Sequence, residues 1–91
     1  MIRLKIDELR KSIDKVDEEI VRLLAERKSI AKEIGKEKKI MRIPVVDAKR
    51  EKEILENLRK KAKENGLEPD FVDSLFRNIL ENSRKVQKNN G

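Results

Sequence analysis

Arg27 departs most clearly from the pattern of the residues around it. Seven apolar residues alternate in spacing of three and four, which is typical of one face of a helix. This apolar stripe consists of Leu9, Ile13, Val16, Ile20, Leu23, Ile30 and Ile34. Arg27 occupies a position on the stripe where a hydrophobic residue belongs. A guanidinium there either extends to solvent, pairs with an acid such as Glu51, or binds an anionic ligand, for which a carboxylate is well suited.

Lys38 is the second cation of interest. It follows Arg27 by eleven residues, about three helical turns, so it faces nearly the same way about 16 Å further along the axis. Ala31 lies between the two and is small enough to leave room for a ligand. The simpler interpretation of Lys38 is a solvated lysine within the charged run KEKK.

A second group of polar residues precedes the apolar positions Ile54, Leu55, Leu58 and Ala62. If the same helical face is extended toward the N-terminus, it includes Glu51 and Asp47. Asp47 has a structural explanation as a helix N-cap, and Glu51 as an acid in the first turn. Arg50 has none, because a cation is mildly unfavourable at a helix N-terminus.

Ser83 and Gln87 form the third group. They share a helical face with Val72, Phe76 and Ile79, where two more hydrophobic residues would be expected. Fraying of the helix end is the alternative explanation. Cations dominate the three groups together, and they predict a small pocket between helices that binds an anion.

Arg10 is harder to assign. It precedes Arg27 by seventeen residues, about 25 Å along a helix, and is rotated from it by roughly 100°. Arg10 therefore cannot easily reach the Arg27 pocket of its own chain, and a surface arginine is the simpler interpretation. Antiparallel pairing of two long helices would bring it to the pocket of a partner.

The elements that must position these residues are all helical, with no alternation typical of strands. We expect one all-α domain over residues 1–91, with helices at about 5–39, 48–65 and 69–88. Pro44 interrupts the chain between the first two helices. Gly66 suits the position after the second helix, and Pro69 suits the first turn of the third.

The first helix is too long for a small globule. About 34 residues form a rod of roughly 50 Å, whereas a compact chain of this length is only about 32 Å across. The other two helices cannot cover the whole apolar stripe. We therefore expect an intertwined helical homodimer in which the long helices pair.

Composition excludes several classes of protein. The sequence has no cysteine and no histidine, which removes disulfides, thiolate nucleophiles and the commonest metal ligands, so we expect no metal site. The net charge of +6 is spread evenly, and the aromatic residues are two phenylalanines, so we expect no nucleic-acid partner. No apolar run is long enough to span a membrane, so we expect no membrane partner and a cytoplasmic protein.

The sequence closely resembles the all-helical chorismate mutases of the AroQ class. The resemblance covers nearly the whole chain, through LRKSIDKVDEEIVRLLAERKSIAKEIGKEK (9–38), PVVDAKREKEIL (44–55) and ILENSRKVQ (79–87). It implies an intertwined dimer of three-helix chains. It also implies an enzyme that converts chorismate to prephenate by a Claisen rearrangement, on the branch leading to phenylalanine and tyrosine.

The resemblance also implies roles for the polar residues. Arg27 would bind one carboxylate of the dianionic substrate, and Arg10 of the partner chain the other. Lys38 and Gln87 would face the ether oxygen whose bond breaks. The remaining residues would hold the ring hydroxyl (Glu51 and the backbone at Asp47) or line the carboxylate end of the pocket (Arg50 and Ser83).

Such a rearrangement needs no nucleophile, proton transfer, metal or cofactor. It needs a substrate held in its reactive shape and donors aimed at the growing charge on the ether oxygen. Two alternatives remain at this point. One is a related lyase that uses the same cationic pocket to cleave isochorismate or to make salicylate. The other is a dimeric helical module without enzymatic activity.

Overall fold

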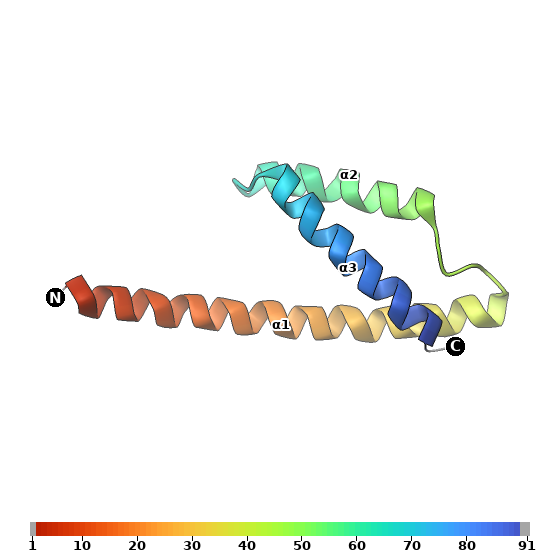
Figure 1. The fold of residues 1–91 in the computed structure, drawn as a ribbon, viewed down its shortest axis with the longest axis horizontal. Coiled ribbons are helices and arrows are strands. Elements are labelled where there is room, and N and C mark those ends of the chain that lie inside the picture. The colour runs from red at the N-terminus through yellow and green to blue at the C-terminus, as the bar shows by residue number, and fades with distance from the viewer. Residues whose placement is uncertain (1, 90–91) are drawn as a thin grey trace. The chain divides into compact units, whose positions relative to one another are not determined.

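The computed structural model describes the backbone of residues 2–89 and the side chains of residues 4–89. It contains three helices, α1 (Ile2–Met41), α2 (Ala48–Glu64) and α3 (Pro69–Asn89), and no strand in the described part of the chain (Figure 1). The predicted all-α, three-helix fold is confirmed. Helix α1 extends beyond the predicted 5–39 at both ends, whereas the other two helices match their predicted bounds to within one residue.

A tight C-terminal cap ends α1. The Ile43 amide donates to the Lys38 carbonyl over 2.8 Å, and the Arg42 amide donates to the Lys39 carbonyl over 3.2 Å. Arg42 takes a left-handed conformation, with φ of 56°, at the position that glycine usually occupies in this motif. The backbone thus turns away from α1 immediately before Pro44.

The ends of α2 and the start of α3 carry residue types that are common at these positions. The Asp47 carboxylate accepts a hydrogen bond from the Arg50 amide over 3.0 Å, which makes it the N-cap of α2. Gly66 follows the helix with φ of 72°, and the next amide, that of Leu67, donates to the Ala62 carbonyl over 2.8 Å. Asp47 as the N-cap of α2 and Gly66 as the residue after its end are therefore confirmed, and Pro69 begins α3 as expected.

The chain divides into two parts. Residues 1–30 belong to the first, and its described residues form a single stretch of α1. Residues 31–91 form the second, in which α2 and α3 pack together and the C-terminal end of α3 lies beside the last turns of α1 (Figure 1). The buried hydrophobic residues of the described chain all lie in this second part: Ala31, Ala62, Val72 and Leu80.

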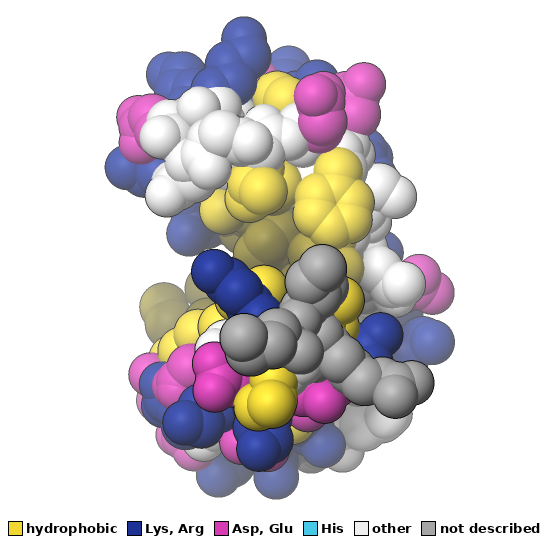
Figure 2. All heavy atoms as spheres, turned by 90° about the vertical axis from the view of Figure 1, so that its left-hand side faces the viewer, with side chains coloured by type: hydrophobic (Ala, Val, Ile, Leu, Met, Phe, Trp, Pro, Cys, Tyr) yellow, Lys and Arg dark blue, Asp and Glu magenta, His cyan; other side chains and the backbone are white. Residues whose placement is uncertain are grey.

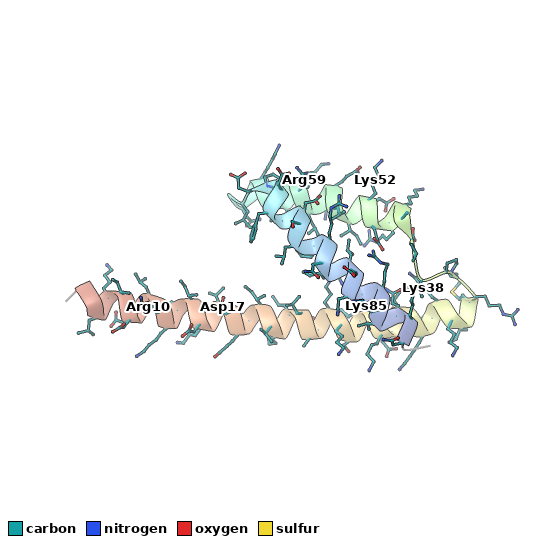
Figure 3. The ribbon with its side chains drawn as sticks, in the orientation of Figure 1. Arg10, Asp17, Lys38, Lys52, Arg59 and Lys85 are labelled. Carbon is teal, nitrogen blue, oxygen red and sulfur yellow. The ribbon has the colours of Figure 1, made fainter. Side chains whose placement is uncertain are left out.

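Charged side chains fasten α2 to α3 near the turn that joins them. Arg59, labelled in Figure 3, pairs with Asp70 over 2.7 Å and with Asp73 over 3.3 Å. Arg77 reaches the other oxygen of Asp73 over 2.5 Å. The hydrogen bond from Arg77 is the main cause of a lowered pKa of Asp73. No helix in the described part of the chain is long and apolar enough to cross a membrane.

Candidate functional site

Lys38 and Gln87 form the centre of the candidate site. The Lys38 ammonium donates to the side-chain oxygen of Gln87 over 3.0 Å and to the main-chain oxygen of Val45 over 2.9 Å. Figure 3 shows Lys38 where the last turns of α1 lie beside the end of α3. Because the Gln87 oxygen accepts from Lys38, its amide NH₂ group is the end that remains to donate. The structure thus brings together two residues that are 49 positions apart in the sequence.

Glu51 lies in a second contact between helices. Its carboxylate accepts a hydrogen bond from the Arg84 guanidinium over 2.6 Å. The side chains of Arg84 and Glu51 are only 32% and 24% exposed, so this pair is better shielded than most ion pairs on the surface. The contact fixes the position of Glu51, one of the predicted site residues, between α2 and α3.

Arg84 was missed in the sequence analysis. It lies one turn before Gln87 and one turn after Leu80, which is buried. The expected apolar face of this helix was drawn through Ile79 and Ser83 and did not include Leu80. The series Leu80, Arg84, Gln87 has helical spacing of four and three, and it would have identified Arg84 as a polar residue on a packed face.

Ser83 is buried within α3, and its hydroxyl donates to the Ile79 carbonyl over 3.1 Å. Because α3 continues to Asn89, fraying does not explain the hydroxyl at this position. Asp47 is the N-cap of α2, which is the structural explanation that the sequence offered for it.

The structure does not bring the Arg50 side chain to the other predicted site residues. This side chain is 65% exposed and lies 3.9 Å from Glu53 on its own helix. The Arg50 backbone amide is the group that contacts Asp47.

The two remaining arginines lie in the first part of the chain. Among residues 4–30, Arg27 alone is not classed with the exposed residues, and this partial burial lowers the pKa of its guanidinium. Arg10 is 75% exposed and lies 3.9 Å from Asp7, one turn away. Seventeen residues of helix separate the two arginines by about 25 Å, so this single helix does not bring them together.

The described residues contain no group of three His, Cys, Asp or Glu side chains that could hold a metal ion. The structure instead shows two polar contacts between helices, one between the Lys38 ammonium and the Gln87 amide and one between the Arg84 guanidinium and the Glu51 carboxylate. Such an arrangement can bind and orient an anionic ligand and can stabilise negative charge that develops on an oxygen atom.

Comparisons with known proteins agree with this chemistry. The family model for chorismate mutase type II matches residues 9–88. A chorismate mutase of Methanocaldococcus jannaschii is 37% identical over 84 residues, which cover 92% of this chain and 85% of that protein. The bifunctional chorismate mutase/prephenate dehydratase of Escherichia coli is 39% identical over 80 residues, which cover 88% of this chain but only 21% of that protein.

A solved structure is also similar. The chain resembles a conserved hypothetical protein from Pyrococcus furiosus with a TM-score of 0.73 and 41% sequence identity, covering 91% of this chain and 95% of that one. Since the family model spans most of the sequence and the relative from Methanocaldococcus jannaschii is matched over most of both lengths, the chain belongs to the chorismate mutase type II family.

Proposed function

We propose that the chain catalyses the rearrangement of chorismate to prephenate as an intertwined homodimer, in a site built from both copies. Family membership supports the reaction and the substrate. The proposal goes further in assigning a role to each polar residue and in requiring a second copy of the chain. The observation that carries it is the hydrogen bond between Lys38 and Gln87.

The geometry of this bond suits the ether oxygen of chorismate. A lysine ammonium has three N–H groups, and Val45 and Gln87 accept two of them. The third N–H and the amide NH₂ of Gln87 can therefore donate to the substrate. As the bond to the ether oxygen breaks, negative charge grows on that oxygen, and two donors aimed at it would lower the barrier.

The carboxylates of the substrate require further cations. We assign one carboxylate to Arg27, whose partial burial suits an anionic partner, and the other to Arg10 of the second copy. Arg50 and Ser83 would line this end of the pocket. Arg50 would have to leave its exposed position beside Glu53 to do so.

The ring hydroxyl of the substrate would contact Glu51 and the backbone at Asp47. Arg84 occupies one oxygen of the Glu51 carboxylate, which leaves the other oxygen to accept from the hydroxyl. Arg84 is thus a positioning residue in this proposal, because it acts on the substrate through Glu51.

The exposed apolar stripe supports the dimer. From Leu9 to Ile30 its residues are between 50% and 61% exposed. Hydrophobic side chains also reach the surface of the α2–α3 pair (Figure 2), where Leu67, Phe71 and Leu75 are exposed. A second copy would cover such surfaces. We also propose the cytoplasm as the compartment of the protein.

The direct test is to incubate the protein with chorismate and to identify the product. Prephenate is expected. A separate incubation with isochorismate tests the lyase, which would release salicylate and pyruvate. If both chorismate and isochorismate stayed unchanged, both enzymatic functions would be contradicted.

The assignment of Gln87 has a sharper test in the pH dependence of Gln87→Glu. An ionised carboxylate has no proton to donate and would repel the charge that grows on the ether oxygen. We therefore expect kcat/KM of this variant to be low near neutral pH and to recover as the pH falls toward the pKa of the introduced carboxyl. Gln87→Ala has no donor to recover and should be poor at every pH. If Gln87→Glu matched the wild type at neutral pH, Gln87 would not contact the ether oxygen.

A further inference from the structure

Gly35 is an unexpected residue for the interior of a long helix. Apart from proline, glycine is the least favourable residue there, because it has the most conformational freedom to lose. Helix α1 nevertheless continues through Gly35 without a break, and Gly35 is buried. A glycine in such a position calls for a local reason, such as the close approach of another segment.

Gln87 supplies this reason. A Cβ atom placed on Gly35 would lie 2.9 Å from the Cα atom of Gln87, 3.0 Å from its main-chain oxygen and 3.3 Å from its Cβ atom. Ordinary van der Waals contact begins at 3.4 Å, so the shortest of these distances falls 0.5 Å below it. Two of the three atoms belong to the backbone and cannot turn aside as the end of a side chain can. Any larger residue at position 35 would therefore push α3 away from α1.

The same residue carries the side chain that binds Lys38. Lys38 follows Gly35 by three residues, so the two lie on neighbouring parts of one helical face. The bond between Lys38 and Gln87 is 3.0 Å long. If the backbone of Gln87 moved outward by 0.5 Å, this bond would reach about 3.5 Å, the limit at which a side-chain hydrogen bond is lost.

We propose that Gly35 is a positioning residue for the rearrangement, because its missing side chain sets the distance at which α3 presents the Gln87 amide to the substrate. The inference rests on the proposed function, in which Gln87 donates to the ether oxygen. It adds a residue that touches neither the substrate nor Lys38 and that acts through the backbone of Gln87.

The test is a double-mutant cycle with Gly35→Ala, Gln87→Ala and the combined variant, measured as kcat and KM for chorismate. A displacement approaching 1 Å in a catalytic group can cost about 100-fold in rate, so we expect Gly35→Ala to lower kcat by about 10- to 100-fold and to change KM less. The combined variant should be no slower than Gln87→Ala alone, since the displaced amide is already absent. Full activity of Gly35→Ala, or losses that multiply in the combined variant, would overturn the proposal.

Gly66→Ala is the matched control. Gly66 has φ of 72°, and no atom lies within 4 Å of an added Cβ atom, so alanine there strains the backbone without touching the site. Its thermal unfolding midpoint should fall while kcat stays unchanged. A loss of kcat in Gly66→Ala as large as that in Gly35→Ala would show that general destabilisation, and not the position of Gln87, explains the effect.

A second variant tests the proposal even if Gly35→Ala does not fold. Gln87→Asn keeps the backbone in place and withdraws the amide by one methylene group, so kcat should fall to a similar extent. Wild-type activity in Gln87→Asn would contradict the proposal, because the reaction would then tolerate a displaced amide. A wild type that did not convert chorismate, or a fully active Gln87→Ala, would contradict the proposed function. Full activity of Gly35→Ala beside an impaired Gln87→Ala would contradict only the role of Gly35.

Discussion

Residues 4–30 and residues 31–89 differ in how their hydrophobic and charged side chains are placed. In the second segment, Ala62, Val72 and Leu80 are buried, and some ion pairs join different helices, as between Arg84 and Glu51. In the first segment the hydrophobic residues of the apolar stripe stay exposed, and the ion pairs are local, as between Arg22 and Glu19. The second segment builds its own small core, whereas the first has an apolar face that its own helix cannot cover.

The size of this apolar face suggests what covers it. Burying a fully exposed Leu or Ile side chain contributes about 1.5–3 kcal/mol, so a residue that is half exposed contributes about 1 kcal/mol. The six stripe residues from Leu9 to Ile30, counted in two copies, would contribute about 12 kcal/mol. Estimates of the cost of association are of the same order, about 4–15 kcal/mol. Removing even part of the stripe should therefore shift the balance between dimer and monomer.

The largest expected effect comes from charging the stripe. Ile13→Asp combined with Ile20→Asp should convert the protein to a monomer and abolish activity, because each site of the proposed dimer needs residues from both copies. Light scattering of the wild type should give twice the chain mass of 10.7 kDa, and that of the variant should give the single mass. Lys11→Asp, which changes the charge by the same amount on the opposite face of α1, should remain dimeric and active. An active monomeric variant would contradict the proposed assembly.

The next effect concerns the two arginines of the first segment. Arg10→Ala and Arg27→Ala should each lower kcat/KM by about 100-fold or more, since each removes a charged partner of a desolvated carboxylate. Mixing the two variants under conditions that exchange subunits should restore about one quarter of wild-type activity, because half of the dimers become heterodimers with one intact site. Arg27→Ala mixed with the double variant should recover nothing. No recovery in the first mixture would mean that Arg10 is not supplied by the partner.

A smaller effect is expected for Arg84 in the second segment. Arg84→Ala leaves Glu51 without its partner, so we expect kcat/KM to fall about 10-fold, or about 1.4 kcal/mol. Arg84→Lys keeps the charge but lacks the planar guanidinium, so its kcat/KM should lie between that of Arg84→Ala and that of the wild type. Lys85→Ala removes an adjacent cation that is 70% exposed and should leave kcat/KM unchanged. Equal activity of Arg84→Ala and the wild type would show that Glu51 does not depend on Arg84.

The smallest effect is on stability in acid, through the ion pairs that fasten α2 to α3. The pKa of Asp73 is lowered in the folded protein, so its ionised form contributes stability above its unfolded pKa of about 3.9, and this is lost as the pH falls through the lowered value. Asp73→Asn should be less stable than the wild type near neutral pH. The difference in the free energy of unfolding, measured with denaturant, should shrink as the pH falls below about 4.

Asp70→Asn removes a partner of Arg59 that is 90% exposed, whereas Asp73 is only 14% exposed. Asp70→Asn should therefore change the pH dependence of the free energy of unfolding less than Asp73→Asn does. An unchanged difference between Asp73→Asn and the wild type across this pH range would contradict the role given to Asp73.

Local sequence signals predicted much of the fold. Gly66, Pro69 and Asp47 define the ends of α2 and α3 because each has a backbone preference or a capping side chain that acts within a few residues. The end of α1 was placed two residues too early, because Arg42 takes the left-handed conformation that usually belongs to glycine. No local signal predicts this conformation of Arg42. A left-handed conformation costs a residue other than glycine about 1–2 kcal/mol, and contacts elsewhere must offset this cost.

The candidate site was harder to predict because its geometry depends on packing. Lys38, Glu51 and Gln87 were proposed as site residues from their positions on helical faces, but their hydrogen-bond partners in the fold depend on packing. Arg84 was missed because the expected apolar face of its helix did not include Leu80. Gly35 could be seen only as a weak point in a helix until the distance to Gln87 was known. Arg50 was selected because a cation is unusual at a helix start, yet its side chain lies exposed.

The two bonds that hold Lys38 also affect how tightly a ligand can bind. A free lysine side chain adopts many conformations, and fixing it in one of them costs up to about 2 kcal/mol in conformational entropy. Val45 and Gln87 already restrict the Lys38 ammonium before any ligand arrives. Most of that entropic cost therefore falls on folding, and an anion that binds Lys38 finds the ammonium already in place.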